Sequence, residues 1–435
     1  MTGQMRSWLA RANPVLFTVF AGLAGFCAYS SMYAFRKPFS AATYEHVAGW
    51  DFALDYKIAL VLAQVAGYAL SKLIGVRIIA ELPAARRASA IIGLILASWF
   101  ALILFAITPA PWNVAALFLN GLPLGLIWGL VFGYMEGRRT SEVLGSILCA
   151  SFILASGMVK SVGKWLMQSF HVSEFWMPAA AGAVFLPLLF VSVWGLTQLP
   201  PPDARDEAER TLRKPMGKAD RAAFLAIYGP GVALLTAAYV LLTAFRDFRD
   251  NFAAEIWTTL GFGDASAVFT ASEAPVAVIS LGIMAAIIVV KENLKALVVI
   301  HLVILAGFAL LGVATLAFQA HLLSPLTWMI LTGAGLYMAY TPFNAMLFDR
   351  MIAYSGQAGT AGFLIYIADA SGYLGSAALL VYRNFFAVQM NWLQFFIASA
   401  YATSLIGVAM VALAAMFFLR RAGLGHQLEP SGQQA

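Results

Sequence analysis

Long runs of apolar residues, separated by short polar breaks, recur along the whole chain. About 20 apolar helical residues cross a membrane core, whereas strands of an outer-membrane barrel alternate over shorter stretches. The runs therefore predict membrane-spanning helices. In the first half the twelve candidate spans cover 14–35, 56–79, 88–108, 112–134, 143–167 and 176–198, and in the second half 222–247, 268–290, 293–318, 325–348, 358–382 and 392–419.

One long polar stretch, residues 200–221, divides these spans into two sets of six and has a linker composition. Two six-helix bundles that flank a central pathway are the arrangement of the major facilitator fold. The predicted fold class is thus an all-α integral membrane protein with twelve transmembrane helices. We expect an N-terminal bundle at 1–199, a cytoplasmic linker at 200–221, a C-terminal bundle at 222–421 and a cytoplasmic tail at 422–435.

Composition agrees with this pattern. Hydrophobic residues make up 61% of the 435 residues and charged residues 11%, against about 25% charge in soluble domains. So few charges cannot cover a water-facing surface, which excludes a soluble enzyme with one anchor. The chain holds two cysteines and five scattered histidines, and it lacks the usual ATPase, hydrolase and metalloprotease motifs. We expect no metal site, no cofactor and no enzymatic activity.

Basic residues gather on one side of the predicted membrane. If both termini are cytoplasmic, 18 of the 27 Lys and Arg residues fall in cytoplasmic segments and six in outer segments. This bias follows the positive-inside rule, and it explains the net charge of +6 without nucleic acid as a partner. We expect an integral protein of a bacterial inner membrane, acting as a monomer in the lipid bilayer with both termini cytoplasmic.

Charged residues also lie inside the predicted spans, among them Asp369, Lys160, Lys164 and Lys72. Asp369 sits eleven residues into its span, roughly 16 Å deep at 1.5 Å per residue. This carboxylate is either a proton or cation site, which would make it the coupling residue, or a structural acid paired with a basic or hydroxyl group. Lys160 is a candidate substrate ligand, but it could also reach the outer interface, as could Lys164; Lys72 lies near the inner surface.

Two basic pairs end the first span of each half. Arg36 and Lys37 end span one, and Arg246 and Arg249 end span seven at a corresponding position. Arginines that face each other across a shared axis could bind phosphate or carboxylate through paired hydrogen bonds. The alternative is local pairing, since Arg246 and Asp250 are four residues apart on one helix. Span counting places these arginines at the outer edge of the membrane.

Four segments resemble the organophosphate:phosphate antiporter family of the major facilitator superfamily, which includes glycerol-3-phosphate and hexose-phosphate transporters. They are AYSSMYAFRKPFSAA in span one, AGYALSKLIG in span two, GLYMAYTP in span ten, and AGTAGF followed by GYLGS in span eleven. Together with the twelve spans, the resemblance covers nearly the whole chain. The sequence also resembles an uncharacterised branch of the superfamily that has no assigned substrate.

The resemblance implies roles for particular residues. Arg36 matches the span-one arginine that binds substrate phosphate, either Arg246 or Arg249 matches its span-seven counterpart, and Lys72 matches the span-two lysine. Tyr340 lies in the span-ten segment and is a further substrate-binding candidate. Ala155 stands where the family has a histidine, so Asp369 fits proton-coupled transport of another anion.

Three functions remain open from the sequence. The leading hypothesis is a secondary active transporter, an antiporter or a symporter, that moves a phosphorylated or carboxylated metabolite with protons or phosphate as coupling ion. The second is a transporter-like sensor that binds its ligand without moving it. The third is a cation-coupled carrier of a neutral solute, in which the arginines are structural.

Overall fold

The apolar runs fold into long helices. The computed structural model describes residues 2–136, 138, 140–202, 206, 218–355 and 362–428, and within these ranges the regular structure is helical. Ten helices in this part of the chain are long and apolar enough to cross a membrane. The predicted spans 325–348 and 358–382 also form helices but are less apolar, because they carry polar residues such as Asp369 into the interior.

The helices of the first half begin with a short amphipathic segment outside the predicted spans. Span four is interrupted after Leu124, so that it forms two consecutive helices. The elements are α1 (Thr2–Arg11), α2 (Pro14–Tyr33), η1 (Pro38–Ala41), α3 (Tyr56–Glu81), η2 (Ala84–Arg86), α4 (Arg87–Ile107), α5 (Asn113–Leu124), α6 (Ile127–Phe132), α7 (Ser141–Phe170) and α8 (Met177–Thr197).

The second half contains two short helices besides its long ones. The short α11 follows α10 almost directly, and α15 follows α14 in the same way. The elements are α10 (Lys218–Asn251), α11 (Ala253–Thr259), α12 (Val268–Ile288), α13 (Asn293–Gln319), α14 (Pro325–Ala345), α15 (Leu347–Ser355), α16 (Gly362–Phe385) and α17 (Trp392–Leu428).

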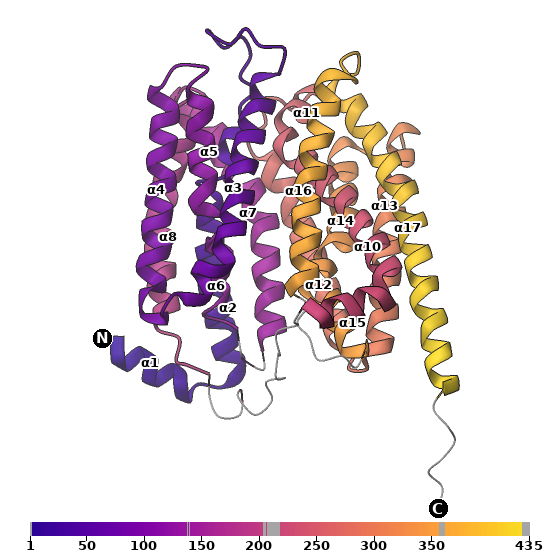
Figure 1. Ribbon diagram of the computed structural model, residues 1–435. Coiled ribbons are helices and arrows are strands. Elements are labelled where there is room, and N and C mark those ends of the chain that lie inside the picture. The colour runs from indigo at the N-terminus through magenta and orange to yellow at the C-terminus, as the bar shows by residue number, and fades with distance from the viewer. Residues whose placement is uncertain are drawn as a thin grey trace, which may run out of the picture.

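The two halves of the sequence lie side by side (Figure 1), and they meet where α7 packs against α12 and α3 against α16. The start of α2 and the end of α17 lie on one face, which we call the terminal face; the loop 42–55 lies on the opposite face. Residues 203–205 and 207–217 of the predicted linker and 429–435 of the tail lie outside the described residues. The domain boundaries and the cytoplasmic placement of the terminal face stay predictions.

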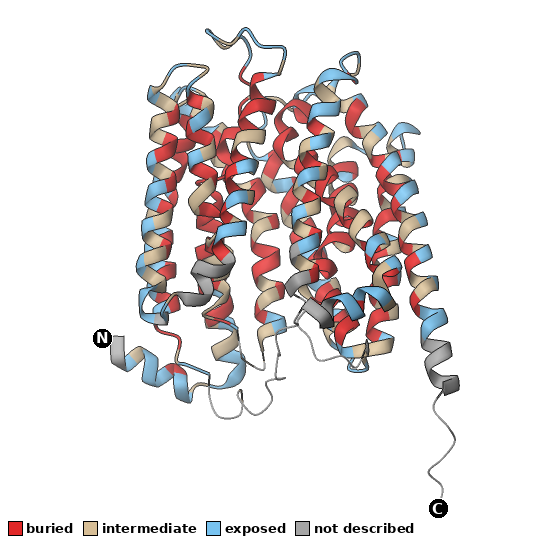
Figure 2. Cartoon of the chain, viewed as in Figure 1, coloured by how far each residue is buried: buried red, intermediate tan, exposed pale blue. Residues whose placement is uncertain are grey.

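Buried residues line the inner sides of the helices, and exposed residues lie along their outer sides (Figure 2). Many exposed side chains are large and apolar, including Val278, Leu374 and Leu405, each more than 70% exposed. Such an apolar surface suits lipid rather than water. The membrane architecture thus follows from both the length of the helices and the chemistry of their outer faces.

Small residues bring α3 and α5 into backbone contact. A Cβ atom added to Gly121 would lie 2.2 Å from the carbonyl oxygen of Gln64, and one added to Gly67 would lie 2.1 Å from that of Phe118. Glycine stripes permit such close approach in membrane helices. This packing holds Gln64 and its neighbours on α3 against the end of α2, where the site begins.

Candidate functional site

Arg36 lies just beyond the end of α2, where the chain leaves the helix and turns into η1. Asn120 donates a hydrogen bond to the carbonyl oxygen of Phe35 (2.9 Å), and Gln64 donates one to that of Arg36 (2.9 Å) and one to Asn120 (2.7 Å). These amides satisfy carbonyl groups that the helix end leaves free. They fix the backbone from which the Arg36 side chain extends.

The guanidinium of Arg36 lies among tyrosines rather than acids. Its Cζ atom is 3.9 Å from the ring centroid of Tyr68 and 5.8 Å from that of Tyr33. The residue is 8% exposed, and its Nε atom is buried without a hydrogen-bond partner. No carboxylate within the described ranges forms an ion pair with it. Asp247 lies within electrostatic range of Arg36 but forms its ion pair with Arg246. A buried cation without an ion pair of its own is electrostatically incomplete.

Arg246, on α10, begins a chain of polar contacts that runs toward the terminal face. Its guanidinium pairs with the adjacent Asp247 (2.7 Å) and also donates to the hydroxyl of Tyr340. The hydroxyl of Tyr239 donates to Asp369 (2.6 Å) and lies 3.0 Å from that of Tyr340. Hydrogen bonds thus connect Arg246 to Asp369 without interruption.

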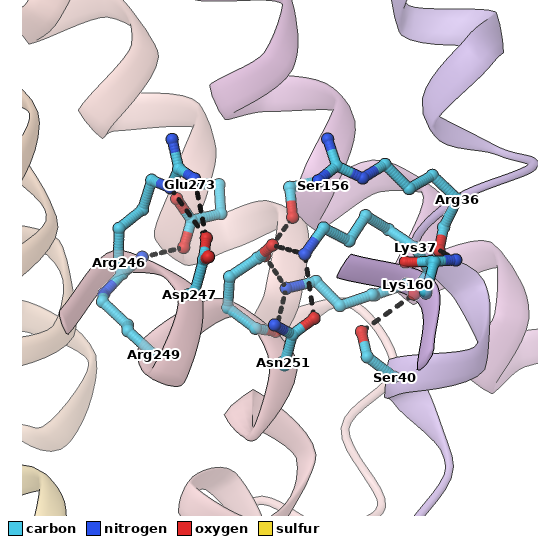
Figure 3. A network of polar contacts seen from close by, with 12 residues as sticks. Arg36, Lys37, Ser40, Ser156, Lys160, Arg246, Asp247, Arg249, Asn251 and Glu273 are labelled. Carbon is cyan, nitrogen blue, oxygen red and sulfur yellow. Dashed lines mark hydrogen bonds and ion pairs between the residues drawn. The ribbon is translucent and has the colours of Figure 1, made fainter. Parts of the chain in front are cut away.

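Asp250 is the centre of a buried charge cluster between the halves. Lys37 and Lys160 both form ion pairs with its carboxylate (Figure 3), at 2.6 Å for Lys160. The hydroxyl of Ser156 donates to the same carboxylate, and Lys37 donates to Asn251 at 2.9 Å. In Figure 3 the side chains of Arg36 and Arg246 enter this region from opposite sides, one from each half. Two lysines therefore share one acid.

Two further ion pairs join the halves at different levels. Lys57, at the start of α3, pairs with Glu255 of α11 at 2.6 Å, and Lys72 pairs with Asp369 of α16 at 2.6 Å. The fifteen residues between the two lysines correspond to about 22 Å of helix. Arg36 contacts Gln64 and Tyr68, which lie midway between them on α3. Its guanidinium is therefore near the centre of the protein along the membrane normal.

The two levels differ in exposure. Lys57 is 1% and Glu255 8% exposed, whereas the side chains of Lys72 and Asp369 are 29% and 19% exposed. Solvent therefore hardly reaches the Lys57–Glu255 pair toward the opposite face, whereas it partly reaches the Lys72–Asp369 pair toward the terminal face.

The charges in and around the site do not balance. Among the described residues of this region, five carboxylates meet seven cationic groups, which leaves an excess of two positive charges largely removed from solvent. One of the excess charges is Arg36, and the other arises because Lys37 and Lys160 share Asp250. The cations are Arg36, Lys37, Lys57, Lys72, Lys160, Arg246 and Arg249, and the acids are Asp247, Asp250, Glu255, Glu273 and Asp369.

Several placements differ from the sequence predictions. Lys160 is 1% exposed and does not reach an interface, because Asp250 pairs with it in the interior. Lys72 likewise contacts Asp369 instead of extending to the surface. The alternative pairing of Arg246 with Asp250 is wrong. Arg246 pairs with Asp247, and Asp250 pairs with Lys37 and Lys160.

The depth predictions also change. The Arg36 side chain lies deeper than span counting indicates, because it extends back along Tyr68. Asp369 lies seven residues from the start of α16, or about 10 Å, so it is closer to the terminal face than to the midplane.

Arg249 does not face the same space as Arg246. It pairs with Glu273 of α12 at 2.6 Å and donates to the carbonyl oxygen of Met329 at 2.9 Å. With 3% exposure it is buried within the second half, where its two terminal nitrogens are paired and its Nε atom has no hydrogen-bond partner. Position in the sequence left the two arginines ambiguous, and these contacts favour Arg246 as the one available to a ligand.

Other members of the site were missed from the sequence. Gln64, Asn120 and Tyr239 are neutral and carry no charge signal, although an amide inside an apolar span marks a buried hydrogen-bonding position. Lys57 lies at the start of span two and Glu255 follows span seven, and a charge at a span end gives no signal of a buried position. The span-eleven segment AGTAGF falls at 358–363, and its residues 358–361 lie outside the described residues. Within the described residues no group of His, Cys, Asp and Glu could hold a metal ion.

Comparison with known proteins places the chain in a family. Residues 38–421 match the model described as "Family of unknown function (DUF5690)". The chain belongs to this family. The DUF5690 match includes every site residue named above from Lys57 to Asp369, while Arg36 and Lys37 directly precede it. No curated protein matches the sequence.

The DUF5690 chain is similar to solved transporter structures. With a D-xylose-proton symporter it shares a TM-score of 0.60 and 16% identity, over 93% of this chain and 97% of that chain. With a POT peptide transporter in complex with sulfate the TM-score is 0.58 and the identity 15%, over 96% and 99%. These similarities confirm the predicted fold class, an all-α membrane protein with the twelve-helix major facilitator fold. At such identities they establish the fold alone.

Proposed function

We propose that this protein is a secondary active transporter that moves a small organic anion by alternating access between its two halves. The observation that carries the proposal is Arg36, a buried guanidinium at the central level that no acid neutralises within the described residues. A charge near the middle of a membrane costs about 2.5–3.5 kcal/mol on insertion scales. An anionic substrate would remove this cost when it binds.

The charge excess supports a substrate with one or two negative charges. A phosphate or carboxylate between Arg36 and Arg246 would accept paired hydrogen bonds from each guanidinium. On substrate binding, the Arg246 guanidinium would leave Asp247 and pair with the substrate instead. Tyr340, whose hydroxyl already accepts a hydrogen bond from Arg246, would orient this guanidinium. Lys37, Lys160 and Arg249 serve in ion pairs that hold the surrounding helices.

Asp369 is the proposed coupling residue. Its carboxylate accepts from Tyr239 and pairs with Lys72 across the halves, so its charge holds α3 and α16 together. A proton on Asp369 would remove the attraction to Lys72 and loosen the terminal side. Substrate at Arg246 would influence the same acid through Tyr340 and Tyr239.

The ion pairs at the two levels act as gates in this proposal. The pairs at Asp250 and Glu255 close the path toward the opposite face, and the Lys72–Asp369 pair controls the path toward the terminal face. Since the second pair is formed but more exposed, we expect the terminal side to open first from the conformer described. With the basic residues gathered there, that face is cytoplasmic in a bacterial inner membrane, and the protein acts as a monomer.

The segment resemblance to organophosphate:phosphate antiporters supports an anionic substrate, because Arg36 and Lys72 lie in two of the matching segments. The absence of that family's histidine at Ala155, together with the Lys72–Asp369 pair, favours protons over phosphate as coupling ion.

Uptake by proteoliposomes tests the proposal. The purified chain is reconstituted, and uptake is measured across a panel of phosphorylated, carboxylated and neutral metabolites with and without a pH gradient. We expect saturable uptake of one class of anion, increased by the gradient. Uptake of neutral solutes alone would contradict an anion site. Thermal stabilisation by an anion without any flux would instead indicate a sensor.

A further inference from the structure

A cavity lies on the opposite face, lined by residues other than those around Arg36. Its volume is about 720 Å³, and it is lined by the loop between η1 and α3 and by the end of α16 with the start of α17. Cavities of small-molecule sites fall between about 300 and 1,000 Å³. The walls therefore come from both halves of the chain, and the space is of a size that fits a metabolite.

Aromatic rings form much of this wall. The Trp50 ring lies 4.6 Å from that of Phe52 and 5.1 Å from that of Tyr56. Trp392 lines the same cavity from α17 with the edge of its ring, because Phe252 stacks on one face at 4.4 Å and Arg383 lies over the other. The indole nitrogen of Trp50 donates to the carbonyl oxygen of Leu54 at 2.7 Å, which fixes the orientation of the ring. A planar ring can make edge-to-face contacts with such aromatic side chains.

The loop that carries these rings is held in an unusual backbone conformation. Tyr44 and His46 both have positive φ, at 55° and 57°. Residues other than glycine adopt this conformation only where the surrounding structure imposes it, and such residues cluster at ligand sites. The loop wall of the cavity is therefore preorganised.

Arg383 supplies a cation at the cavity. Its guanidinium lies 4.5 Å above the Trp392 ring and donates one hydrogen bond to the carbonyl oxygen of Ala387 (3.1 Å), while its Nε atom is buried without a partner. Among described residues no acid forms an ion pair with it. Asp55, also in the lining, lies within electrostatic range but accepts the backbone N–H of Ile58 at the start of α3. The guanidinium is thus available to an anionic group.

Asn384 ties the two walls together. Its side chain accepts from the backbone N–H of Asp55 (2.9 Å) and donates to the carbonyl oxygen of Ala53 (3.0 Å). The cavity has this shape only while the loop of the first half rests on α16 of the second. A ligand that fills it binds this closed arrangement better than one in which the halves have separated, and so shifts the equilibrium toward it.

We propose that this cavity is a regulatory site for an organic anion with a planar ring, such as an aromatic carboxylate, and that its ligand holds the opposite face closed. The carboxylate binds Arg383, and the ring packs between the Trp50 and Trp392 sides of the cavity. Binding here does not depend on transport, so the site is separate from the one around Arg36.

Calorimetric titration of the full chain in nanodiscs tests the site, with indole-3-carboxylate as the probe and neutral indole-3-carboxamide as its matched control. We expect saturable binding of the carboxylate and weaker binding of the amide. Arg383→Gln should weaken binding of the carboxylate at least about tenfold, or 1.4 kcal/mol. Arg36→Gln should leave it unchanged. Absence of saturable binding at millimolar probe, or a loss caused by Arg36→Gln instead of Arg383→Gln, would overturn the proposal.

A distance measurement between the two halves tests whether the ligand holds the opposite face closed. Spin labels are placed at Phe170→Cys and Leu322→Cys, at exposed positions at the ends of α7 and α13, after Cys27 and Cys149 are replaced by serine. Indole-3-carboxylate should increase the population with the short distance, and Asn384→Ala should decrease it in the absence of probe. An unchanged or longer distance in the presence of bound probe would contradict the regulatory role, even if the titration succeeds.

Discussion

At the scale of single residues, the protein places charges where a membrane makes them costly and pairs most of them. Lys57, Lys72 and Lys160 come from the first half, and the acids that pair with them come from the second. Removal of one partner of a buried pair typically costs about 3–5 kcal/mol, because the other charge is left alone. Arg36 is different, since it makes no such pair within the described residues.

Replacement of Arg36 tests its role directly. Arg36→Gln should abolish anion uptake in proteoliposomes, because the neutral amide cannot compensate the substrate charge, while the folded protein should be at least as thermostable as the wild type. The control is Lys164→Gln, one turn beyond Lys160 on the half-exposed side of α7, which should retain uptake. Uptake by Arg36→Gln at the wild-type rate would exclude this guanidinium from the substrate site.

Asp369 should control coupling rather than binding. Asp369→Asn cannot exchange a proton, so uptake driven by a pH gradient should be lost while exchange of substrate across the membrane continues. Because this variant leaves Lys72 without its partner, the double variant Lys72→Gln, Asp369→Asn serves as the control and should regain stability without regaining coupling. Proton-driven uptake by either variant would contradict the coupling role.

At the scale of helices, close packing around glycines sets the geometry of the site. Gly121 allows the α5 backbone to contact α3 at Gln64, and Gln64 in turn holds the backbone of Arg36. The position of Arg36 therefore depends on helix packing as well as on its own turn.

Gly121→Ala should destabilise the protein by about 1–3 kcal/mol, because the added methyl group would overlap the carbonyl of Gln64 and force the helices apart. Gly93→Ala is the matched control, since a Cβ at Gly93 has no atom within 4 Å. Thermal unfolding of the purified proteins in detergent would compare them. Equal melting temperatures for both variants would show that the contact is not required.

The sequence predicts the helices better than it predicts their contacts. Apolar runs of about 20 residues and their polar breaks are local signals, so the fold class and the presence of Asp369 inside the protein could be predicted. The same signals placed Arg36 at the outer edge and Lys72 near the inner surface, because they do not show where a long side chain extends. Which acid meets which lysine depends on how helices far apart in sequence pack. For this reason the sequence offered Arg246, on the same helix, as an alternative partner for Asp250, which instead pairs with Lys37 and Lys160. Neutral members such as Tyr239 carry no local signal at all.

At the scale of the whole molecule, two helical halves are joined by ion pairs at two levels with Arg36 between them. Asp250→Asn should open the opposite face, because two buried lysines would lose their shared acid. The spin-label distance between residues 170 and 322 should lengthen. Glu292→Gln, which breaks the exposed pair with Lys295, is the control and should leave the distance unchanged, since such surface pairs contribute at most about 1 kcal/mol. An unchanged distance in Asp250→Asn would mean that the cluster is no gate.

The central claim is that a substrate anion occupies the space between Arg36 and Arg246. The most direct measurement is an experimental structure of the full chain with the anion identified by uptake, determined by electron cryomicroscopy in nanodiscs. Density for the anion should contact the guanidinium of Arg36, with Arg246 turned from Asp247 toward it. An anion bound elsewhere, or Arg36 turned toward lipid headgroups or paired with an acid, would contradict the account.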